Sequence, residues 1–300
     1  MTRTLVTGAA GFTGRYLTRL MAGEGHEVHA VVHHDPDVPI ANAAHVHVAD
    51  LAIEAAISRV VNAVRPERVV HLAAIAFVAH GDIDEMYSAN VVGTRQLLDA
   101  LSRLPEAPAS VVVASSANVY GNAREGVLDE SMPRAPANDY GVTKVAVEYL
   151  AQLYSNRLPL IVVRPFNYTG QGQSENFLIP KIVTHAAQRA PVIALGNLDV
   201  SRDFSDVRSV VRSYARLLEC PQAIGGTYNI CSGRAVSLRQ ILDMVSTLSG
   251  HRSEVRVNPA LVRADEVRIL IGSAAKLEQV IGPLDRIPLE DTLRWMLEAK

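Results

Sequence analysis

Hydrophobic residues along the first half of the chain recur in two alternating patterns. Short apolar runs typical of buried strands predict strands over residues 5–7, 27–33, 44–49, 68–74, 110–116 and 160–164. Between these runs, helical spacing of hydrophobic residues predicts helices over 15–23, 52–64, 84–103 and 139–156. Because strands that alternate with helices form parallel sheets covered on both faces, we expect an α/β fold with a doubly wound parallel sheet.

The pattern loosens after Pro165. A helix over 206–219 and a strand over 228–231 are predicted as late elements of the same sheet, and further helices are predicted over 237–250 and 289–298. We therefore expect two units, of which residues 1–165 and 204–231 form the sheet domain. Residues 166–203 and 232–300 form a smaller C-terminal α+β lobe. The cleft between the two is the expected substrate site.

Three glycines follow the first predicted strand. Gly8, Gly11 and Gly14 have the spacing G-x-x-G-x-x-G and directly precede a predicted helix. Glycines at such a junction let the chain turn sharply and let backbone N–H groups approach a phosphate, while the helix N-terminus adds a positive dipole end. This order of strand, glycines and helix predicts a dinucleotide site rather than a plain turn, with Phe12 and Thr13 also at the cofactor.

The end of the second predicted strand should lie beside the adenine ribose of a dinucleotide. An acidic residue about 20 residues past the glycines usually marks NAD. Here the strand ends at His33, and Asp35 already lies in a turn. Arg15, directly after Gly14, could instead meet a 2′-phosphate, so the sequence favours NADP over NAD while leaving both open.

The ends of the next two predicted strands also offer cofactor contacts. The carboxylate of Asp50, followed by Leu51, could accept a hydrogen bond from the adenine amino group or cap the helix over 52–64, and the two roles are compatible. The fourth predicted strand ends in Leu72, Ala73 and Ala74, and the small alanines would let a dinucleotide lie against the backbone.

Two groups of polar residues inside these elements need an explanation. Asn90 interrupts the apolar pattern of 84–103, and a buried Asn is costly unless it is hydrogen-bonded, so we expect it to tie this helix to a neighbouring loop. His45 and His47 alternate on one strand and share a face. They have no third ligand nearby, so we expect a polar strand face and no metal site.

Composition excludes several classes of protein. The net charge is −2 and no block of Lys or Arg occurs, so we expect no nucleic-acid partner. Cys220 and Cys231 form no C-x-x-C pair, as expected of reduced cysteines in the cytoplasm. The chain enters a strand at once and no apolar run approaches about 18 residues, so we expect neither a signal peptide nor a membrane span.

Tyr140, Lys144 and a strand-end serine form the candidate catalytic set. Tyr140 and Lys144 are four residues apart on a predicted helix and share a face. An ammonium beside a phenol lowers its pKa, so Tyr140 could give or take a proton near neutral pH. Ser115 and Ser116 end a strand, where sheets of this kind place functional side chains, and a hydroxyl there can hydrogen-bond a carbonyl that is being reduced.

These motifs resemble those of the extended short-chain dehydrogenases/reductases. The motifs that carry the resemblance are Gly8-x-x-Gly11-x-x-Gly14, Asp50-Leu51, His71-Leu72-Ala73-Ala74, Asn90, the run from Ser115 to Gly121, Tyr140-x-x-x-Lys144 and Arg164-Pro165-Phe166-Asn167. The resemblance implies a Rossmann domain that binds NADP(H) or NAD(H), with Pro165 also at the cofactor. It further implies that Ser116 and Tyr140 contact the C4 oxygen of a hexose, and that Lys144 binds the nicotinamide ribose and tunes Tyr140.

The C-terminal half narrows the resemblance to enzymes that act on nucleotide sugars. Residues 200–207 and 263–273 are similar to segments of the GDP-mannose 4,6-dehydratases and the GDP-4-keto-6-deoxymannose reductases. The resemblance implies that Arg202 and Arg263 bind the diphosphate, which the planar guanidinium suits, and that Glu266 binds guanine or ribose. Alternatively, Arg202–Asp203 and Arg263–Asp265 are surface ion pairs of little energetic value.

Asn118 separates reduction from dehydration. By resemblance, Asn118 and Asn167 belong to the substrate site, and the dehydratases carry a Glu at the place of Asn118 that removes the C5 proton. An amide is no base at pH 7, whereas ketone reduction needs only a hydride and a proton from Tyr140. The sequence therefore favours reduction of the C4 ketone of a GDP-4-keto-6-deoxyhexose to GDP-D-rhamnose.

Three other functions stay open at this point. A nucleotide-sugar 4-epimerase with tightly bound NAD would use the same Ser, Tyr and Lys, a GDP-mannose 4,6-dehydratase-like enzyme shares the C-terminal segments, and a dinucleotide sensor would lack catalysis altogether. The helices over 84–103 and 139–156 could pair across a two-fold axis in a four-helix bundle. Since dimers of that kind are common in the family, we expect a homodimer. We expect a GDP-sugar as the substrate, and no contact with membranes or nucleic acids.

Overall fold

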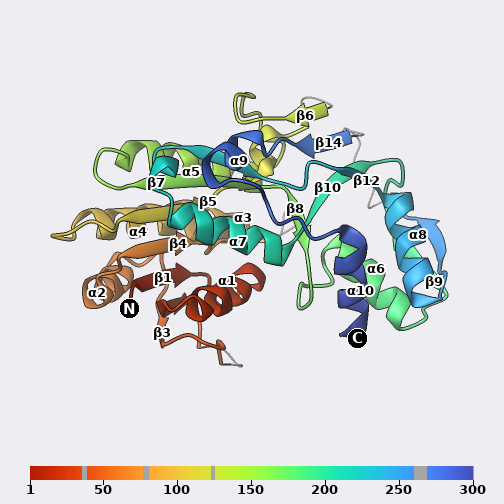
Figure 1. Ribbon diagram of the computed structural model, residues 1–300, viewed down its shortest axis with the longest axis horizontal. Coiled ribbons are helices and arrows are strands. Elements are labelled where there is room, and N and C mark those ends of the chain that lie inside the picture. Colours follow the sequence, from red (N-terminus) through yellow and green to blue (C-terminus); the bar gives the residue numbers. More distant parts are fainter. Residues whose placement is uncertain (36–38, 77–80, 123–125, 260–268, 300) are drawn as a thin grey trace.

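A seven-stranded, all-parallel sheet forms the centre of the molecule (Figure 1). The computed structural model describes residues 1–35, 39–76, 81–122, 126–259 and 269–299. The strand order is β11-β7-β5-β4-β1-β2-β3. The strands are β1 (Arg3–Thr7), β2 (Glu27–Val32), β3 (His45–Val48), β4 (Arg68–His71), β5 (Ser110–Ala114), β7 (Leu160–Pro165) and β11 (Thr227–Ile230). The order reverses beside β1, as in dinucleotide-binding sheets, and the expected fold class is confirmed.

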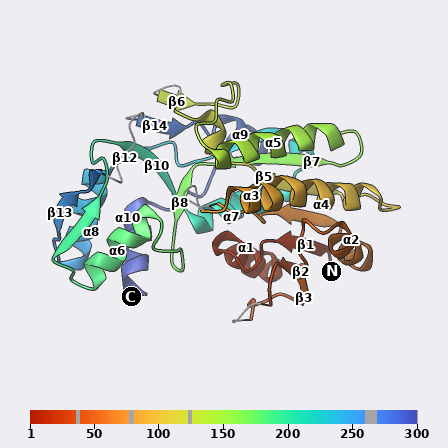
Figure 2. The ribbon, with the colours of Figure 1, turned by 180° about the vertical axis from the view of Figure 1, so that it is seen from behind.

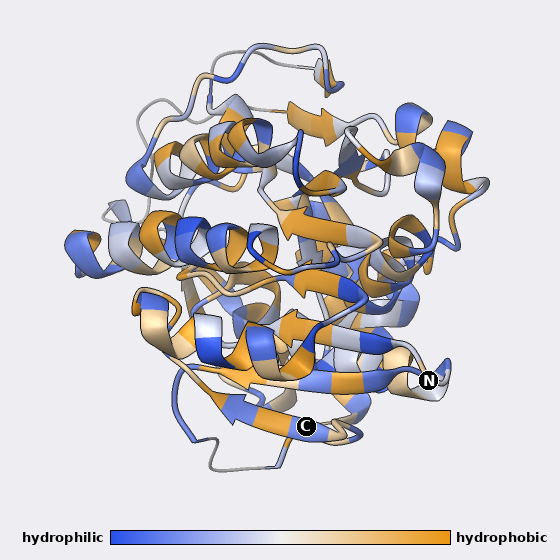
Figure 3. Cartoon of the chain, turned by 90° about the vertical axis from the view of Figure 1, so that its left-hand side faces the viewer, coloured by the Kyte–Doolittle hydropathy of each residue, from blue (hydrophilic) through white to orange (hydrophobic). Residues whose placement is uncertain are grey.

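Helices cover both faces of this sheet. On one face lie α1 (Phe12–Gly23) and α7 (Val207–Leu218), and on the other α2 (Glu54–Val64), α4 (Gly93–Ser102) and α5 (Asp139–Tyr154). Alternate strand residues serve the two layers, so that Val28 and Ala30 pack with α1 and α7 while Val31 packs with α2. Hydrophobic residues accordingly run along the central strands, between helices of mixed hydropathy (Figure 3).

The helix predicted over 84–103 has three parts. It begins as α3 (Ile83–Tyr87), widens into a π-helix over Ser88–Val92 and continues as α4. Asn90 lies buried in the π-helical part, where its Oδ1 accepts from the Ile75 N–H at 2.8 Å and its Nδ2 donates to the Ile75 carbonyl at 3.1 Å. The expectation that Asn90 ties this helix to a neighbouring loop is confirmed.

A smaller part of the molecule lies beyond the carboxyl ends of the sheet (Figures 1 and 2). Its strands are β6 (Gly126–Leu128), β8 (Asn167–Thr169), β9 (Val192–Leu195), β10 (Ser201–Asp206), β12 (Ala235–Ser237), β13 (Glu254–Val257) and β14 (Ile269–Gly272). Strands β12, β10, β14 and β6 form one sheet, β8 pairs with β10, and β13 pairs with β9. The helices of this part are α6 (Leu178–Ala187), α8 (Leu238–Ser249) and α10 (Leu289–Glu298), whereas α9 (Ala275–Ile281) packs with α7 against the large sheet.

The helix predicted over 206–219 and the strand predicted over 228–231 are present as α7 and β11, and both belong to the large sheet domain. Helix α7 covers the large sheet and β11 is its edge strand. The division of the chain at residues 165, 203 and 231 stays a prediction, and β6, from the first segment, pairs with β14 of the smaller sheet. Among the described residues, no helix is both long and apolar enough to cross a membrane.

Candidate active site

The glycine turn after β1 brings three chain segments into close contact. Gly8 has a φ of 68°, and a Cβ there would lie 2.7 Å from the backbone nitrogen of Ala73. A Cβ on Gly14 would lie 2.2 Å from the Gly8 carbonyl oxygen. Only glycine fits at these two positions, because the first needs a left-handed backbone and the second lets α1 pack against the turn.

Helix α1 begins at Phe12, three residues earlier than predicted, because Gly11 already supplies an extended N-cap backbone. Gly11 has no side chain, and no side chain caps this helix. Backbone N–H groups of the first turn have no partner within a helix, so an uncapped first turn suits an anion such as a phosphate. The turn thus fits the diphosphate of a dinucleotide. Thr13, in that first turn, shares a 2.8 Å hydrogen bond with the hydroxyl of Tyr168.

We expect Gly14→Ala to weaken binding of NADPH and NADH at least tenfold, because the added methyl group would overlap the Gly8 carbonyl and displace the turn. Fluorescence titration of the reduced dinucleotides measures this. Gly23→Ala, in the last turn of the same helix, is the matched control because its Cβ would meet nothing within 4 Å. It should keep the affinity and gain about 0.5–1 kcal/mol of stability. Equal affinities in both variants would contradict the role of Gly14.

The expected adenine-side residues lie at the ends of β2 and β3. The Nε2 of His33 lies 3.6 Å from Asp50 Oδ2. Asp50 Oδ1 accepts from the N–H of Ala52 at 2.8 Å, but α2 begins only at Glu54, with Ile53 as its N-cap residue. The prediction that Asp50 caps this helix was therefore wrong, because an additional turn separates the two. Arg15 is exposed on α1 and donates to the Ala10 carbonyl at 2.8 Å.

The small residues expected to face the dinucleotide lie in a loop. Strand β4 ends at His71, so Leu72, Ala73 and Ala74 follow the strand instead of ending it. His71 is buried and anchors this strand end through hydrogen bonds to Thr7 (2.7 Å) and Thr94 (2.8 Å). Burial lowers the pKa of His71 to about 3, with a smaller contribution from the Lys144 charge, so the ring stays neutral. Pro165 ends β7.

Tyr140, Lys144 and Ser116 lie together at the carboxyl end of β5. Tyr140 and Lys144 share one face of α5, with Lys144 Nζ 5.8 Å from the centroid of the Tyr140 ring. Lys144 donates to the Ala114 carbonyl at 2.9 Å. The structure therefore groups the three residues that the sequence placed in the catalytic set.

The protonation of this group differs from the expectation. Burial raises the pKa of the Tyr140 phenol, the nearby Tyr168 raises it further, and the hydrogen bond with Ser116 opposes both. Burial also lowers the pKa of Lys144 to about 8. The net shift of the Tyr140 pKa is therefore upward, opposite to the predicted lowering by Lys144, because desolvation of the phenol dominates. The phenol consequently keeps its proton at neutral pH.

Asn118 holds the hydroxyl of Ser116. Both the backbone N–H and the side-chain Nδ2 of Asn118 donate to Ser116 Oγ, at 3.1 and 3.0 Å. Because the oxygen accepts two hydrogen bonds, its own proton is left to point elsewhere, toward Tyr140 or toward a substrate oxygen. The amide at position 118 thus orients a hydroxyl and offers no base.

Ser115 points away from this group, into a buried polar network that sequence reasoning missed. Its hydroxyl donates to Glu148 Oε1 at 2.7 Å. Glu148 also accepts two 2.7 Å hydrogen bonds from Arg164, which in turn donates to Tyr120 at 2.9 Å. The available signal was an acidic residue within the apolar stripe of the helix over 139–156. The two serines therefore have different partners, and only Ser116 contacts Tyr140.

The residues expected at the substrate diphosphate are described only in part. Arg202 lies on β10 and donates to the Ser201 carbonyl at 2.9 Å, and Asn167 on β8 donates to the Asp203 carbonyl at 3.3 Å. Asp203 is fully buried, and its carboxylate accepts from the backbone N–H groups of Ser232 and Gly233. The alternative of a surface ion pair at Asp203 was therefore wrong. Arg263, Asp265 and Glu266 lie outside the described residues.

Residues 5–296 match the family model described as GDP-mannose 4,6 dehydratase. The chain belongs to this family. Within it, the chain is 33% identical to the GDP-6-deoxy-D-talose 4-dehydrogenase of Aggregatibacter actinomycetemcomitans over 282 residues, 93% of this chain and 90% of the relative. It is 32% identical to the GDP-6-deoxy-D-mannose reductase of Pseudomonas aeruginosa over 307 residues, 98% of this chain and 96% of the relative.

Solved structures agree with the family membership. A putative epimerase from Burkholderia cenocepacia is 47% identical and superposes with a TM-score of 0.94 over 99% of this chain and 97% of that chain. The structure of RMD from Pseudomonas aeruginosa complexed with NADPH is 29% identical, with a TM-score of 0.85 over 99% of this chain and 97% of that chain. The GDP-mannose 4,6-dehydratase family is NAD(P)-dependent, so the expected class of cofactor is confirmed.

Proposed function

We propose that this protein reduces the C4 ketone of a GDP-linked 4-keto-6-deoxyhexose with NADPH or NADH, yielding GDP-D-rhamnose. The observation that carries the proposal is the pair of hydrogen bonds from Asn118 to Ser116. Position 118 holds an amide that orients the catalytic hydroxyl, so the carboxylate base needed for C5 deprotonation is missing there. Reduction needs no such base.

The relatives support a redox reaction on a GDP-6-deoxyhexose. Two curated relatives that this chain matches over nearly its whole length are named as a GDP-6-deoxy-D-talose 4-dehydrogenase and a GDP-6-deoxy-D-mannose reductase. Both names describe a GDP-6-deoxyhexose, and the first places the redox step at C4. The two names differ in the sugar, talose or mannose. Identification of the product will therefore show which face of the ketone receives the hydride.

The protonated phenol of Tyr140 and its neighbours Ser116 and Lys144 suit this reaction. The bound reduced nicotinamide would supply a hydride to C4. Tyr140, whose raised pKa keeps its phenol protonated, would pass that proton to the C4 oxygen. Ser116, held by Asn118, would donate a hydrogen bond to the same oxygen. Lys144 lies next to both and would bind the nicotinamide ribose.

The remaining assignments complete this proposal. Gly8, Gly11, Phe12, Thr13 and Gly14 would hold the diphosphate of the cofactor. The adenosine end of the cofactor would contact Arg15, His33, Asp50 and Leu51. The nicotinamide end would contact Leu72, Ala73, Ala74 and Pro165. The GDP-sugar would contact Asn167, Arg202, Arg263 and Glu266. The expected homodimer stays a prediction, which the exposed Tyr149 and Leu153 on α5 support.

A second candidate is a nucleotide-sugar 4-epimerase, because the 47% identical structure is described as a putative epimerase. An epimerase regenerates its cofactor in each cycle and needs no added reductant. We expect the purified protein to release little NAD on denaturation, and we expect GDP to raise its melting temperature more than UDP does. Tightly bound NAD and stabilisation by UDP would favour the epimerase.

Incubation with GDP-4-keto-6-deoxy-D-mannose and NADPH, then NADH, tests the proposal. We expect one reduced cofactor to be oxidised per sugar, followed at 340 nm (the nicotinamide absorbance), and a product that NMR identifies as GDP-D-rhamnose. GDP-mannose with NADP⁺ serves as the control and should give no 4-keto sugar. If neither NADPH nor NADH is oxidised, the proposed reduction is contradicted. A keto product from GDP-mannose would favour the dehydratase.

A further inference from the structure

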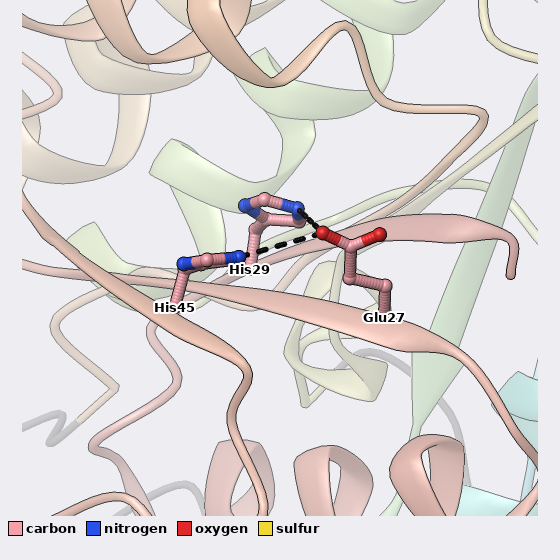
Figure 4. Close-up of side chains that lie close together, drawn as sticks. All are labelled: Glu27, His29 and His45. Atoms are coloured by element: carbon pink, nitrogen blue, oxygen red, sulfur yellow. Dashed lines mark ion pairs between the residues drawn. The ribbon is translucent and has the colours of Figure 1, made fainter.

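Three histidines and a glutamate gather on the edge of the parallel sheet, and Figure 4 shows Glu27, His29 and His45 of this cluster. Glu27 and His29 lie on β2, and His45 and His47 lie on the edge strand β3. The two strands pair in parallel with His29 opposite His45. Because alternate residues of a strand share a face, the four side chains lie on the same face of the sheet. The expectation that His45 and His47 lack a third ligand nearby was wrong, because the neighbouring strand supplies two.

Three ligand atoms converge within this cluster. Glu27 Oε1 lies 3.3 Å from His29 Nε2 and 3.4 Å from His45 Nε2, as the dashed lines in Figure 4 show. All three atoms lie within 4.8 Å of one another. Nitrogen and oxygen ligands about 2.0–2.1 Å from a tetrahedral zinc ion are separated by about 3.3 Å. Both distances from the carboxylate oxygen therefore match the spacing of ligands around one ion.

We propose that Glu27, His29 and His45 bind a divalent transition-metal ion, with Zn²⁺ as the best match. Two imidazoles and a carboxylate are a ligand set that zinc accepts, and water would occupy the fourth position. The site is open to solvent on one side, because His45 and Glu27 are partly exposed whereas His29 is buried. An ion could therefore enter from the His45 side.

The buried ring of His29 carries the strongest argument. Its Nε2 is buried and, although 3.3 Å from Glu27, has no aligned hydrogen-bond partner among the described residues. Its Nδ1 lies 3.1 Å from His47 Nε2. When the proton of His29 resides on Nδ1 and is donated to His47, Nε2 directs a lone pair toward a carboxylate, and a cation between the two satisfies both. His47 then orients His29 and does not bind the ion.

The site lies away from the proposed active site. Glu27 is the first residue of β2, whereas the glycine turn and Tyr140 lie at the carboxyl ends of the parallel strands. A bound ion would join the edge strand β3 to β2, and its role is to stabilise the edge of the sheet. The proposal therefore holds or fails independently of the proposed reaction.

Zinc titration of protein that carries no histidine tag and has been stripped with EDTA tests the proposal. Isothermal titration calorimetry should show one Zn²⁺ bound per chain, and zinc should raise the melting temperature. His45→Gln and Glu27→Gln, which change partly exposed side chains, should each weaken binding at least tenfold and remove the thermal shift. His47→Gln should weaken binding about 10–100-fold, as loss of an orienting partner does. His185→Gln on α6 is the matched control and should bind zinc as the unchanged protein does.

Anomalous scattering at the zinc edge from crystals of the loaded protein locates the ion. A peak between Glu27 Oε1 and the Nε2 atoms of His29 and His45 is the expected result. The proposal is overturned if the unchanged protein binds no zinc, if the peak lies elsewhere, or if His45→Gln and Glu27→Gln bind zinc as tightly as the unchanged protein. In the last case the cluster is an ion pair and not a metal site.

Discussion

Tyr140→Phe should lower kcat for ketone reduction at least a hundredfold while leaving the affinity for NADPH nearly unchanged. The substitution removes one hydroxyl from a buried ring and keeps the ring itself. Ser116 stays hydrogen-bonded to Asn118, and Lys144 stays hydrogen-bonded to Ala114, so the rest of the site keeps its geometry. A positioned general acid contributes about 10²–10⁴-fold to a rate, which sets the expected loss.

Tyr149→Phe is the matched control for this prediction. It makes the same change on the same helix, but Tyr149 lies nine residues after Tyr140, is exposed and contacts Arg134. Steady-state oxidation of NADPH and dinucleotide titration should give unchanged values for this variant. A Tyr140→Phe enzyme that keeps more than a tenth of the activity would contradict the role of the phenol. If the unchanged protein has no turnover at all, the dinucleotide-sensor interpretation gains support.

The parallel sheet and its helices could be predicted because their signals are local. Buried parallel strands are continuous apolar runs, and the hydrophobic residues of the helices between them recur at helical spacing. Each element can therefore be recognised from a short stretch of sequence. The glycine turn was also predictable, since Gly8 and Gly14 are required by backbone geometry that the spacing of the motif implies. Tyr140 and Lys144 share a face of α5 for the same local reason.

Deviations from regular geometry were not visible in the pattern of hydrophobic residues. The π-helical turn at Ser88–Val92 lies inside a stretch whose apolar positions fit one continuous helix, and only the polar Asn90 marked it. The extra turn that separates Asp50 from α2 contains ordinary residues. Asn90 makes its hydrogen bonds to the distant Ile75, whereas the turn after Asp50 is held by a local hydrogen bond from Ala52 to Asp50.

Pairs of polar residues from distant segments could not be predicted at all. Glu27 and His45 come together only because β3 lies beside β2 in a particular register, and Glu148 meets Arg164 only because α5 packs on the sheet. The direction of the pKa shift of Tyr140 has the same origin. The sequence shows the nearby lysine, whereas the burial that raises the pKa of the phenol depends on the whole fold.

The Glu148–Arg164 pair should be highly sensitive to substitution. Both side chains are almost fully buried, and two 2.7 Å hydrogen bonds join them. Glu148 receives a further hydrogen bond from Ser115, directly before Ser116 of the proposed catalytic set. Removing Arg164 would leave a carboxylate in the interior, and among the described residues only the more distant Arg134, 3.3 Å from Glu148, would remain to compensate its charge. A buried charge that loses its partner is strongly destabilising.

Arg164→Leu should therefore lower the free energy of unfolding by about 3–5 kcal/mol, measured by urea denaturation. Arg239→Leu, which removes an exposed partner of Asp199, is the matched control and should change stability far less, because solvent screens that pair. Adding Glu148→Gln to Arg164→Leu should restore part of the loss, since the unpaired charge disappears with it. Equal losses for Arg164→Leu and Arg239→Leu, or no recovery in the double variant, would show that the ion pair does not hold this part of the site together.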